Sequence, residues 1–582
     1  MVDKRLYERD NNIRHTLHSY ITDDQGGFYW YHNFERLKAV PDGQNSEQLN
    51  HYENTLGGKP IEFLQSFLYS TLDEARLRKA NIFAEYALFI SDKSSFAYFR
   101  RAESRREISG EVDYEKHRDH AVHTLYNYLL GWYIFEKSKI IQENFRNIFQ
   151  KIYYADKYEE FRKKGENEFL SKKEKEFYFD DINKEFKLGT NEITMGLANL
   201  FGDVWPQASL LHDIGYILEG SLSSITSEVE HERVTNGAKA LHDYFNHWAW
   251  KRLKVDFRAA REIAKVVANC KVPNFKDSRS FPSLADHLRD VGVLENIRNK
   301  DEDAVNKFLS LTARNSEEYD LNLEAFKLWE IFYEKYIEPR IAEKILKEVK
   351  KQFESDVWEG GPTTKSRNLN HGVCGGLILL QAATFWYELV WGLESKQIIT
   401  AKHKEDTEVS KKNFQEIKEK IGNKRIPPHI KHRCLDPDFF TFEDWIKDLW
   451  ASSSVAIHDY VTKETWNVKK NAELKIQIEE DPLAYLQILV DLMQEWDRYT
   501  VLGESAFVGA ELLQSYEALL EFDEKTSKFK FAFPWRENST KQYGDEIGKN
   551  LERILIYWKK HIDLRQEQEN GYMEEVDPNK AR

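Results

Sequence analysis

Residues 204–218 read Val-Trp-Pro-Gln-Ala-Ser-Leu-Leu-His-Asp-Ile-Gly-Tyr-Ile-Leu, an apolar stretch that contains one imidazole and one carboxylate. The pattern predicts a buried helix, which would place His212 and Asp213 in the protein interior. Neither group is tolerated there without a strong partner, and a divalent metal ion is such a partner. Gly215 leaves room for a neighbouring helix to approach this point. The alternative is an aspartate helix cap beside a hydrogen-bonded histidine.

The composition of the 582-residue chain favours long helices. Only 27 Gly and 13 Pro interrupt it, and a hydrophobic content of 41% supplies a core. Three other apolar stretches follow a helical period, at 119–136, 371–393 and 483–496. Phe529, Phe531 and Phe533 alternate with other residues before a proline, which predicts a small β element. We therefore expect a mainly α protein with a small β element near the C-terminus.

The length is about four times that of a typical single domain, so more than one structural unit is expected. Residues 1–110 form an aromatic-rich N-terminal region without a recognisable motif, and their role is unknown. Residues 111–500 hold the histidine and aspartate motifs, with highly charged insertions at about 250–365 and 402–440. Residues 501–582 contain the β element and a polar tail.

Charge and cysteine content narrow the class of protein. The 84 Lys and Arg against 98 Asp and Glu give a net charge of −14, which argues against a protein that coats nucleic acid. Three cysteines are too few for a disulfide framework, and residues 1–10 lack the apolar core of a secretory signal. Gln381 and Glu388 interrupt the apolar residues 375–393, which favours a core helix over a membrane span. We expect a cytoplasmic protein without a membrane partner, and the oligomeric state stays open.

Common catalytic motifs are missing from the sequence. It contains no G-x-x-x-x-G-K-[ST], G-x-G-x-x-G, G-x-S-x-G, H-E-x-x-H or C-x-x-C. P-loop ATPases, simple Rossmann enzymes, α/β-hydrolases and common zinc proteases are therefore disfavoured. The remaining candidates for chemistry are histidines and aspartates in apolar helical stretches.

Several other histidines compete for a functional role. The dipeptides His242-Asp243 and His458-Asp459 are each followed by Tyr, and not by the Ile-Gly that follows Asp213. His231 lies in a polar segment, where an exposed histidine is ordinary. Residues 428–434 hold two histidines and one cysteine, but a structural zinc site normally needs four ligands.

In chain order the candidates form the pattern H…HD…H…H…D, given by His123, His212, Asp213, His371, His458 and Asp491. Over residues 117–498 this order resembles the HD-domain superfamily of metal-dependent phosphohydrolases. The resemblance implies an HD-type helical core with long helical insertions, and one or two divalent ions among Mn, Mg, Fe, Co, Ni and Zn. It also implies that these six residues are metal ligands, and that His212 and Asp213 are catalytic. His120 competes with His123, which we prefer because a small polar residue and an apolar run follow it, as in the family.

The resemblance further implies a two-metal hydrolase that needs no protein nucleophile, with Asp213 bridging the ions. Basic residues near the motifs are candidates to bind substrate phosphate, namely Arg118, Lys365, Arg367 and Arg498. Family members act on several phosphate esters, and the acidic charge favours a small nucleotide over nucleic acid. Our first choice is a metal-dependent phosphohydrolase that acts on nucleotides, with deoxynucleoside triphosphate triphosphohydrolase as a candidate for its specific activity. The alternatives are a nuclease, a cyclic-nucleotide phosphodiesterase, or a non-catalytic ligand-binding or assembly scaffold with an HD fold.

Overall fold

The computed structural model describes about a third of the chain, and the fold is given for that part. The described residues lie, with short gaps, at 12–23, 50–100, 120–153, 185–217, 371–383, 442–464, 476–497, 517–533, 562–567 and 573–575, together with residue 419. They are mostly helical, and two small sheets account for the strands. A mainly α protein with a small β element near the C-terminus is thus confirmed.

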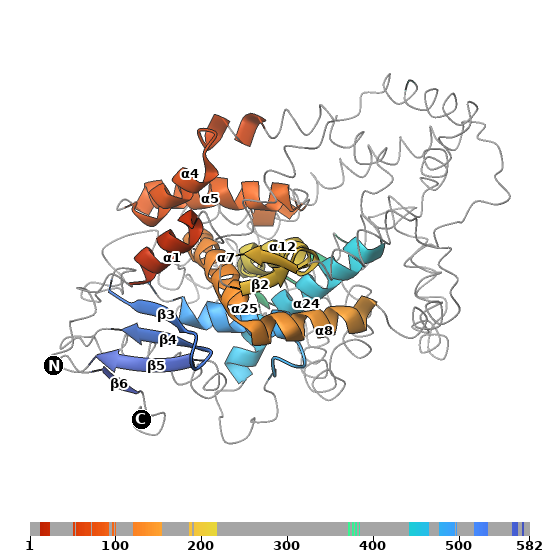
Figure 1. The fold of residues 1–582 in the computed structure, drawn as a ribbon. Helices are drawn as coiled ribbons and strands as arrows, with labels where there is room; N and C mark the ends of the chain where they lie inside the picture. Colours follow the sequence, from red (N-terminus) through yellow and green to blue (C-terminus); the bar gives the residue numbers. More distant parts are fainter. Residues whose placement is uncertain are drawn as a thin grey trace, which may run out of the picture.

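Four helices at the centre of the molecule pack against one another (Figure 1). They are α7 (His120–Lys137), α12 (Met195–Leu210), α24 (Phe442–Glu464) and α25 (Pro482–Met493). Nearly every residue of α7 and α25 is buried, because apolar residues occur all round these helices and not only on one face. Helix α8 (Lys139–Tyr153) packs against α7 and α25. Among the described helices, none is both long and apolar enough to cross a membrane.

Helices α7 and α12 approach each other closely at Gly131. A Cβ atom added there would lie 1.9 Å from Cζ2 of Trp205, so only glycine fits beneath this indole. The same Trp205 donates a hydrogen bond from Nε1 to the carbonyl oxygen of Tyr128, at 3.0 Å. Next to it Phe135 and Phe201 stack with ring centroids 3.8 Å apart. These contacts fix the position of α12 relative to α7.

Helices from the N-terminal region cover the central helices and reach the C-terminal sheet. They are α1 (Ile13–Thr22), α4 (Pro60–Leu68) and α5 (Asp73–Ile90). Asn12 caps α1 by accepting a hydrogen bond from the backbone N–H of His15, at 2.9 Å. Helix α1 lies beside strand β3 (Leu519–Asp523), and its Thr16 hydroxyl donates to the carbonyl oxygen of Leu520 at 2.8 Å (Figure 1). Segments from opposite ends of the sequence therefore pack together.

The C-terminal sheet has the strand order β3-β4-β5-β6, with β4 (Lys528–Phe533), β5 (Ile562–Glu567) and β6 (Met573–Glu575). The β4 and β5 strands pair in parallel, and the outer pairs are antiparallel. Phe529 and Phe531 lie in β4, which confirms the β element that their alternation predicted. Both are buried and contact the rings of Tyr133 and Trp496, respectively. A separate hairpin joins β1 (Glu185–Leu188) to β2 (Asn191–Thr194).

The helices predicted at 119–136 and 483–496 are confirmed as α7 and α25, the latter ending at Met493. The described residues between 371 and 383 are also helical, and the rest of the stretch predicted to Leu393 lies outside the described residues. The helix predicted at 204–218 is wrong in its extent. Helix α12 ends at Leu210, residues 211–213 form a turn, and a short 3-10 helix, η4 (Ile214–Ile217), follows.

Hydrogen bonds explain why the helix stops at Leu210. The carbonyl oxygen of Leu210 accepts from the guanidinium of Arg100 at 2.7 Å, and that of Ser209 accepts from Nδ1 of His212 at 2.7 Å. The N–H of Ile214 bonds to Leu211, three residues back, instead of to Leu210. Side chains therefore occupy the carbonyls that a longer helix would use.

We predict a pH-dependent stability from Asp481, the residue that caps α25. Its Oδ1 accepts from the N–H of Ala484 at 3.1 Å and from Nε1 of Trp450 at 3.0 Å, and burial raises its pKa to about 6. Because the folded state binds this proton more tightly than the unfolded state, the contribution to stability is full below about pH 4. It is lost as the pH rises to about 6.

The Asp481→Asn variant keeps the cap and removes the buried charge. We expect it to be more stable than the wild type at about pH 8, by at most roughly 3 kcal/mol, and to lose this advantage near pH 4. Denaturant unfolding of both proteins across this pH range tests the expectation. A difference that does not change with pH would contradict it.

Candidate metal centre

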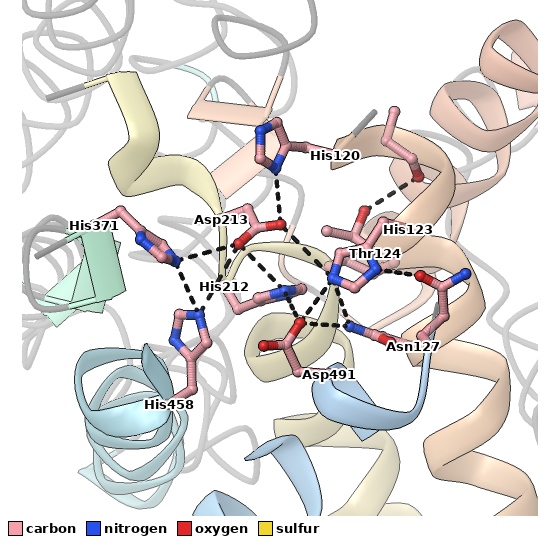
Figure 2. A network of polar contacts seen from close by, with 12 residues as sticks. His120, His123, Thr124, Asn127, His212, Asp213, His371, His458 and Asp491 are labelled. Carbon is pink, nitrogen blue, oxygen red and sulfur yellow. Dashed lines mark hydrogen bonds and ion pairs between the residues drawn. The ribbon is translucent and has the colours of Figure 1, made fainter. Parts of the chain in front are cut away.

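The six residues predicted as metal ligands lie together at the centre of the helical bundle (Figure 2). Helix α7 supplies His123, the turn after α12 supplies His212 and Asp213, and α24 and α25 supply His458 and Asp491. His371 comes from the helical residues that start at 371. The side chains are almost fully buried, except that of Asp491, which is 22% exposed. Five separate segments of the chain thus bring six ligand-type side chains to one point.

The carboxylate of Asp213 lies between two sets of imidazoles. Its Oδ2 is 2.9 Å from Nδ1 of His120 and 4.0 Å from Nε2 of His123. Its Oδ1 is 3.6 Å from Nε2 of His371 and 3.9 Å from Nε2 of His458. Ligand atoms within 4.8 Å of one another form three overlapping groups. Two of them share Asp213, one with His123 and His212 and one with His371 and His458, and the third joins His212, His458 and Asp491. A carboxylate in this position is able to face two ions at once.

Two of the histidines are oriented in the same way, each by the backbone carbonyl three residues before it. Nδ1 of His212 lies 2.7 Å from the carbonyl oxygen of Ser209, and Nδ1 of His458 lies 2.7 Å from that of Val455. A carbonyl oxygen only accepts, so each Nδ1 carries the hydrogen. In the neutral imidazole the lone pair is then on Nε2, which points to the centre. Metal-binding histidines are commonly oriented in this way, by a hydrogen bond from the ring nitrogen that does not face the metal.

His123 is held by an amide instead of by a backbone carbonyl. Its Nδ1 contacts Oε1 of Gln494, and Nε2 of Gln494 donates to the carbonyl oxygen of Trp496 at 2.6 Å, which fixes the amide orientation. Nε2 of His123 lies 2.7 Å from Oδ1 of Asp491 and 3.1 Å from Nδ2 of Asn127. The sequence interpretation missed Gln494 and Asn127. Both are polar residues one helical turn from a predicted ligand inside an apolar stretch, and that spacing was the available signal.

The chemistry of the donor set fits a divalent ion. Nε2 of His212 lies 3.3 Å from Asp213 and 3.4 Å from Asp491, yet it makes no hydrogen bond within the described part of the chain. Burial alone would lower the pKa of His212, but the two carboxylates outweigh burial and raise it to about 9. Burial and the charges of His212 and His371 lower the pKa of His458 to about 4. Imidazole nitrogens around one buried and one partly buried carboxylate suit a divalent transition metal.

Both histidines that competed for the first ligand position reach the site. The carboxylate of Asp213 can only accept, so Nδ1 of His120 carries the hydrogen of their 2.9 Å contact. The groups of converging ligand atoms contain His123 and not His120. The geometry therefore favours His123 as a ligand and His120 as a hydrogen-bond donor to Asp213.

Gly215 permits the approach of the chain that carries His371. A Cβ atom on Gly215 would lie 1.7 Å from the carbonyl oxygen of His371 and 2.7 Å from the nitrogen of Gly375. Both are backbone atoms, which cannot move aside as a flexible side chain can. The role expected of Gly215 from the sequence, to leave room for a neighbouring helix, agrees with this contact.

Other residues singled out in the sequence lie outside the described part of the chain. These are the phosphate-binding candidates Arg118, Lys365, Arg367 and Arg498, and also His231, His242, Asp243 and residues 428–434. Their roles stay predictions.

Comparison of the chain with protein-family models, with curated proteins and with solved structures finds no match. The support for a function comes from the arrangement of the described side chains and from the order in which they occur along the chain.

We predict that ion binding releases a proton. At neutral pH the carboxylates of Asp213 and Asp491 hold a proton on His212, whose pKa is about 9, and an ion must displace it. The apparent affinity for Co²⁺ should therefore rise by about tenfold per pH unit below pH 9. Titration calorimetry in two buffers of different ionisation enthalpy measures the proton release, with Asp213→Asn as the variant that lacks binding. An affinity independent of pH would contradict the prediction.

We also predict that Gly215→Ala weakens ion binding about tenfold or more, because the added Cβ displaces the backbone at His371. The matched control is Gly58→Ala. Gly58 has a φ of +69° and no neighbour within 4 Å of an added Cβ, so its cost is backbone strain of about 1 kcal/mol, with no effect on the centre. Co²⁺ affinity and melting temperature of both variants distinguish the two effects. Equal affinities in the two variants would count against the role of Gly215.

Proposed function

We propose that this protein is a metal-dependent phosphohydrolase with an HD-type helical core, and that it acts on nucleotides. The first candidate activity is deoxynucleoside triphosphate triphosphohydrolase. The observation that carries the proposal is the buried Asp213 carboxylate, whose two oxygens face different imidazoles. The order H…HD…H…H…D along the chain supports it.

The residues divide into two sets that share Asp213. His123, His212 and Asp213 would hold one ion together with Asp491, whose Oδ1 lies 2.7 Å from His123 and 3.4 Å from His212. Asp213, His371 and His458 would hold a second. Divalent ions supply Lewis acidity, which polarises a phosphoryl oxygen and makes water acidic enough to react at neutral pH.

The protein's own side chains keep this centre in position. The carbonyls of Ser209 and Val455 and the amide of Gln494 orient three imidazoles, and His120 holds one oxygen of Asp213. Orientation by such outer partners affects metal affinity and activity strongly.

Exposure of the ligands indicates the direction from which a substrate approaches. The Asp491 side chain is 22% exposed, whereas that of Asp213 is 6% exposed and that of His212 is fully buried. A phosphate group would therefore reach the centre on the Asp491 side. The acidic net charge of −14 supports a small nucleotide and not a polynucleotide as the substrate.

The experiment that tests the function is a hydrolysis screen with added Mn²⁺, Mg²⁺, Co²⁺ and Ni²⁺. The substrates are deoxynucleotides, ribonucleotides, cyclic nucleotides and single-stranded DNA, each at low and physiological salt. We expect turnover of mononucleotides that varies little with salt. Salt-tolerant degradation of DNA without mononucleotide turnover would support a nuclease, and ion binding without any hydrolysis would support a scaffold.

We predict that hydrolysis requires the candidate ligands and does not require the second His-Asp pair of the sequence. His212→Ala, Asp213→Ala and Asp491→Ala should each abolish hydrolysis, because each removes a side chain that would hold the ion. His242→Ala and Asp243→Ala alter the second His-Asp pair of the sequence and should leave the rate within a few-fold of wild type. If Asp243 proves as necessary as Asp213, the assignment of the motif is wrong.

A further inference from the structure

Arg100 is a buried cation that connects two of the segments carrying the candidate ligands. Only 2% of the residue is exposed. Its Nη1 donates to the carbonyl oxygen of Leu210 at 2.7 Å and to the hydroxyl of Thr124 at 2.8 Å, and its Nη2 donates to the carbonyl oxygen of Ala121 at 3.2 Å. The sequence interpretation assigned no role to this residue or to the region 1–110 in which it lies.

On one side Arg100 determines where α12 ends. In a continuing helix the carbonyl of Leu210 would accept from the N–H of Ile214, four residues later. That N–H bonds instead to Leu211 at 3.3 Å, and the guanidinium takes the carbonyl of Leu210. A cation at a helix C-terminus is also favoured by the helix dipole. The chain turns directly after this bond, and the turn carries His212 and Asp213.

On the other side Arg100 contacts the beginning of α7. Ala121 directly follows His120, and Thr124 directly follows His123, as Figure 2 shows for the second pair. A guanidinium presents its donors in a rigid planar fork. One side chain therefore sets the spacing between the start of α7 and the turn after α12.

We propose that Arg100 is a positioning residue of the candidate metal centre. It ends α12 at Leu210 and holds the turn with His212 and Asp213 against the first residues of α7. This role rests on the proposed function, because it presupposes that the centre binds an ion.

The direction in which ion affinity changes when Arg100 is replaced distinguishes a positioning role from a purely electrostatic role. A buried cation near a cation site repels the ion, so an Arg100 that acted only through its charge would weaken binding, and its removal would tighten binding. A positioning residue has the opposite effect, since its loss misplaces the ligands. Lysine at this position keeps the charge but lacks the fork that bonds to both segments.

The experiment measures Co²⁺ affinity and the visible absorption spectrum of the Co²⁺-loaded full chain for wild type, Arg100→Lys and Arg100→Met. We expect both variants to bind Co²⁺ about tenfold to a hundredfold more weakly, with altered absorption bands. Thr124→Val removes only one of the acceptors of the Arg100 guanidinium. It is the milder variant, and it tests the proposal if the Arg100 variants do not fold. It should weaken binding several-fold.

The control is Leu17→Ala, which removes buried side-chain atoms from α1. It should lower the melting temperature and leave the Co²⁺ affinity and spectrum of the wild type unchanged. Wild-type or tighter affinity with an unchanged spectrum in the folded variants overturns the role of Arg100 and leaves the metal centre standing. Failure of the wild type to bind Co²⁺ overturns the metal centre itself, and the role of Arg100 with it.

Discussion

The burial of the Asp213 carboxylate is the constraint on which the rest of the centre depends. Removing a carboxylate from water costs several kcal/mol unless positive charge or hydrogen-bond donors compensate. Here the charges of His212 and His120, together with a hydrogen bond from His120, hold the pKa of Asp213 well below its usual range in spite of that burial. His212 and His120 therefore compensate the burial of Asp213 in the folded protein even without an ion, and their positions depend on that of Asp213.

Close helix packing supplies the positions. Gly131 lets the indole of Trp205 lie directly on α7, and Gly215 lets the backbone at His371 lie directly on the turn after α12. Both contacts bring segments far apart in the sequence to distances that no larger residue allows. Rigid helices at such distances hold ligand atoms more accurately than loops do.

Periodicity and buried polar residues are local signals, and they predicted the helical class, the bounds of α7 and the importance of His212 and Asp213. The full set of six side chains came from the resemblance to the HD-domain order along the chain. The helix predicted at 204–218 runs past the observed end of α12 at Leu210, since the bond that ends this helix comes from Arg100, 110 residues earlier in the chain. Periodicity carries no information about such a contact. The sequence did not predict the roles of Gln494 and Asn127. Both amides contact His123, and for Gln494 that contact joins α7 to the residues after α25, which only the folded structure shows.

The arrangement also links ion binding to folding. The ligand atoms come from five segments and meet only in the folded chain, so an ion that binds them stabilises the folded state over the unfolded state. Without an ion, a protonated His212 lies between the carboxylates of Asp213 and Asp491, and its positive charge reduces the repulsion between them. A single proton screens two carboxylates less completely than a divalent ion does. An ion bound by these side chains would therefore stabilise the centre more than the proton does, and the effect would act first on α7, α12 and α25.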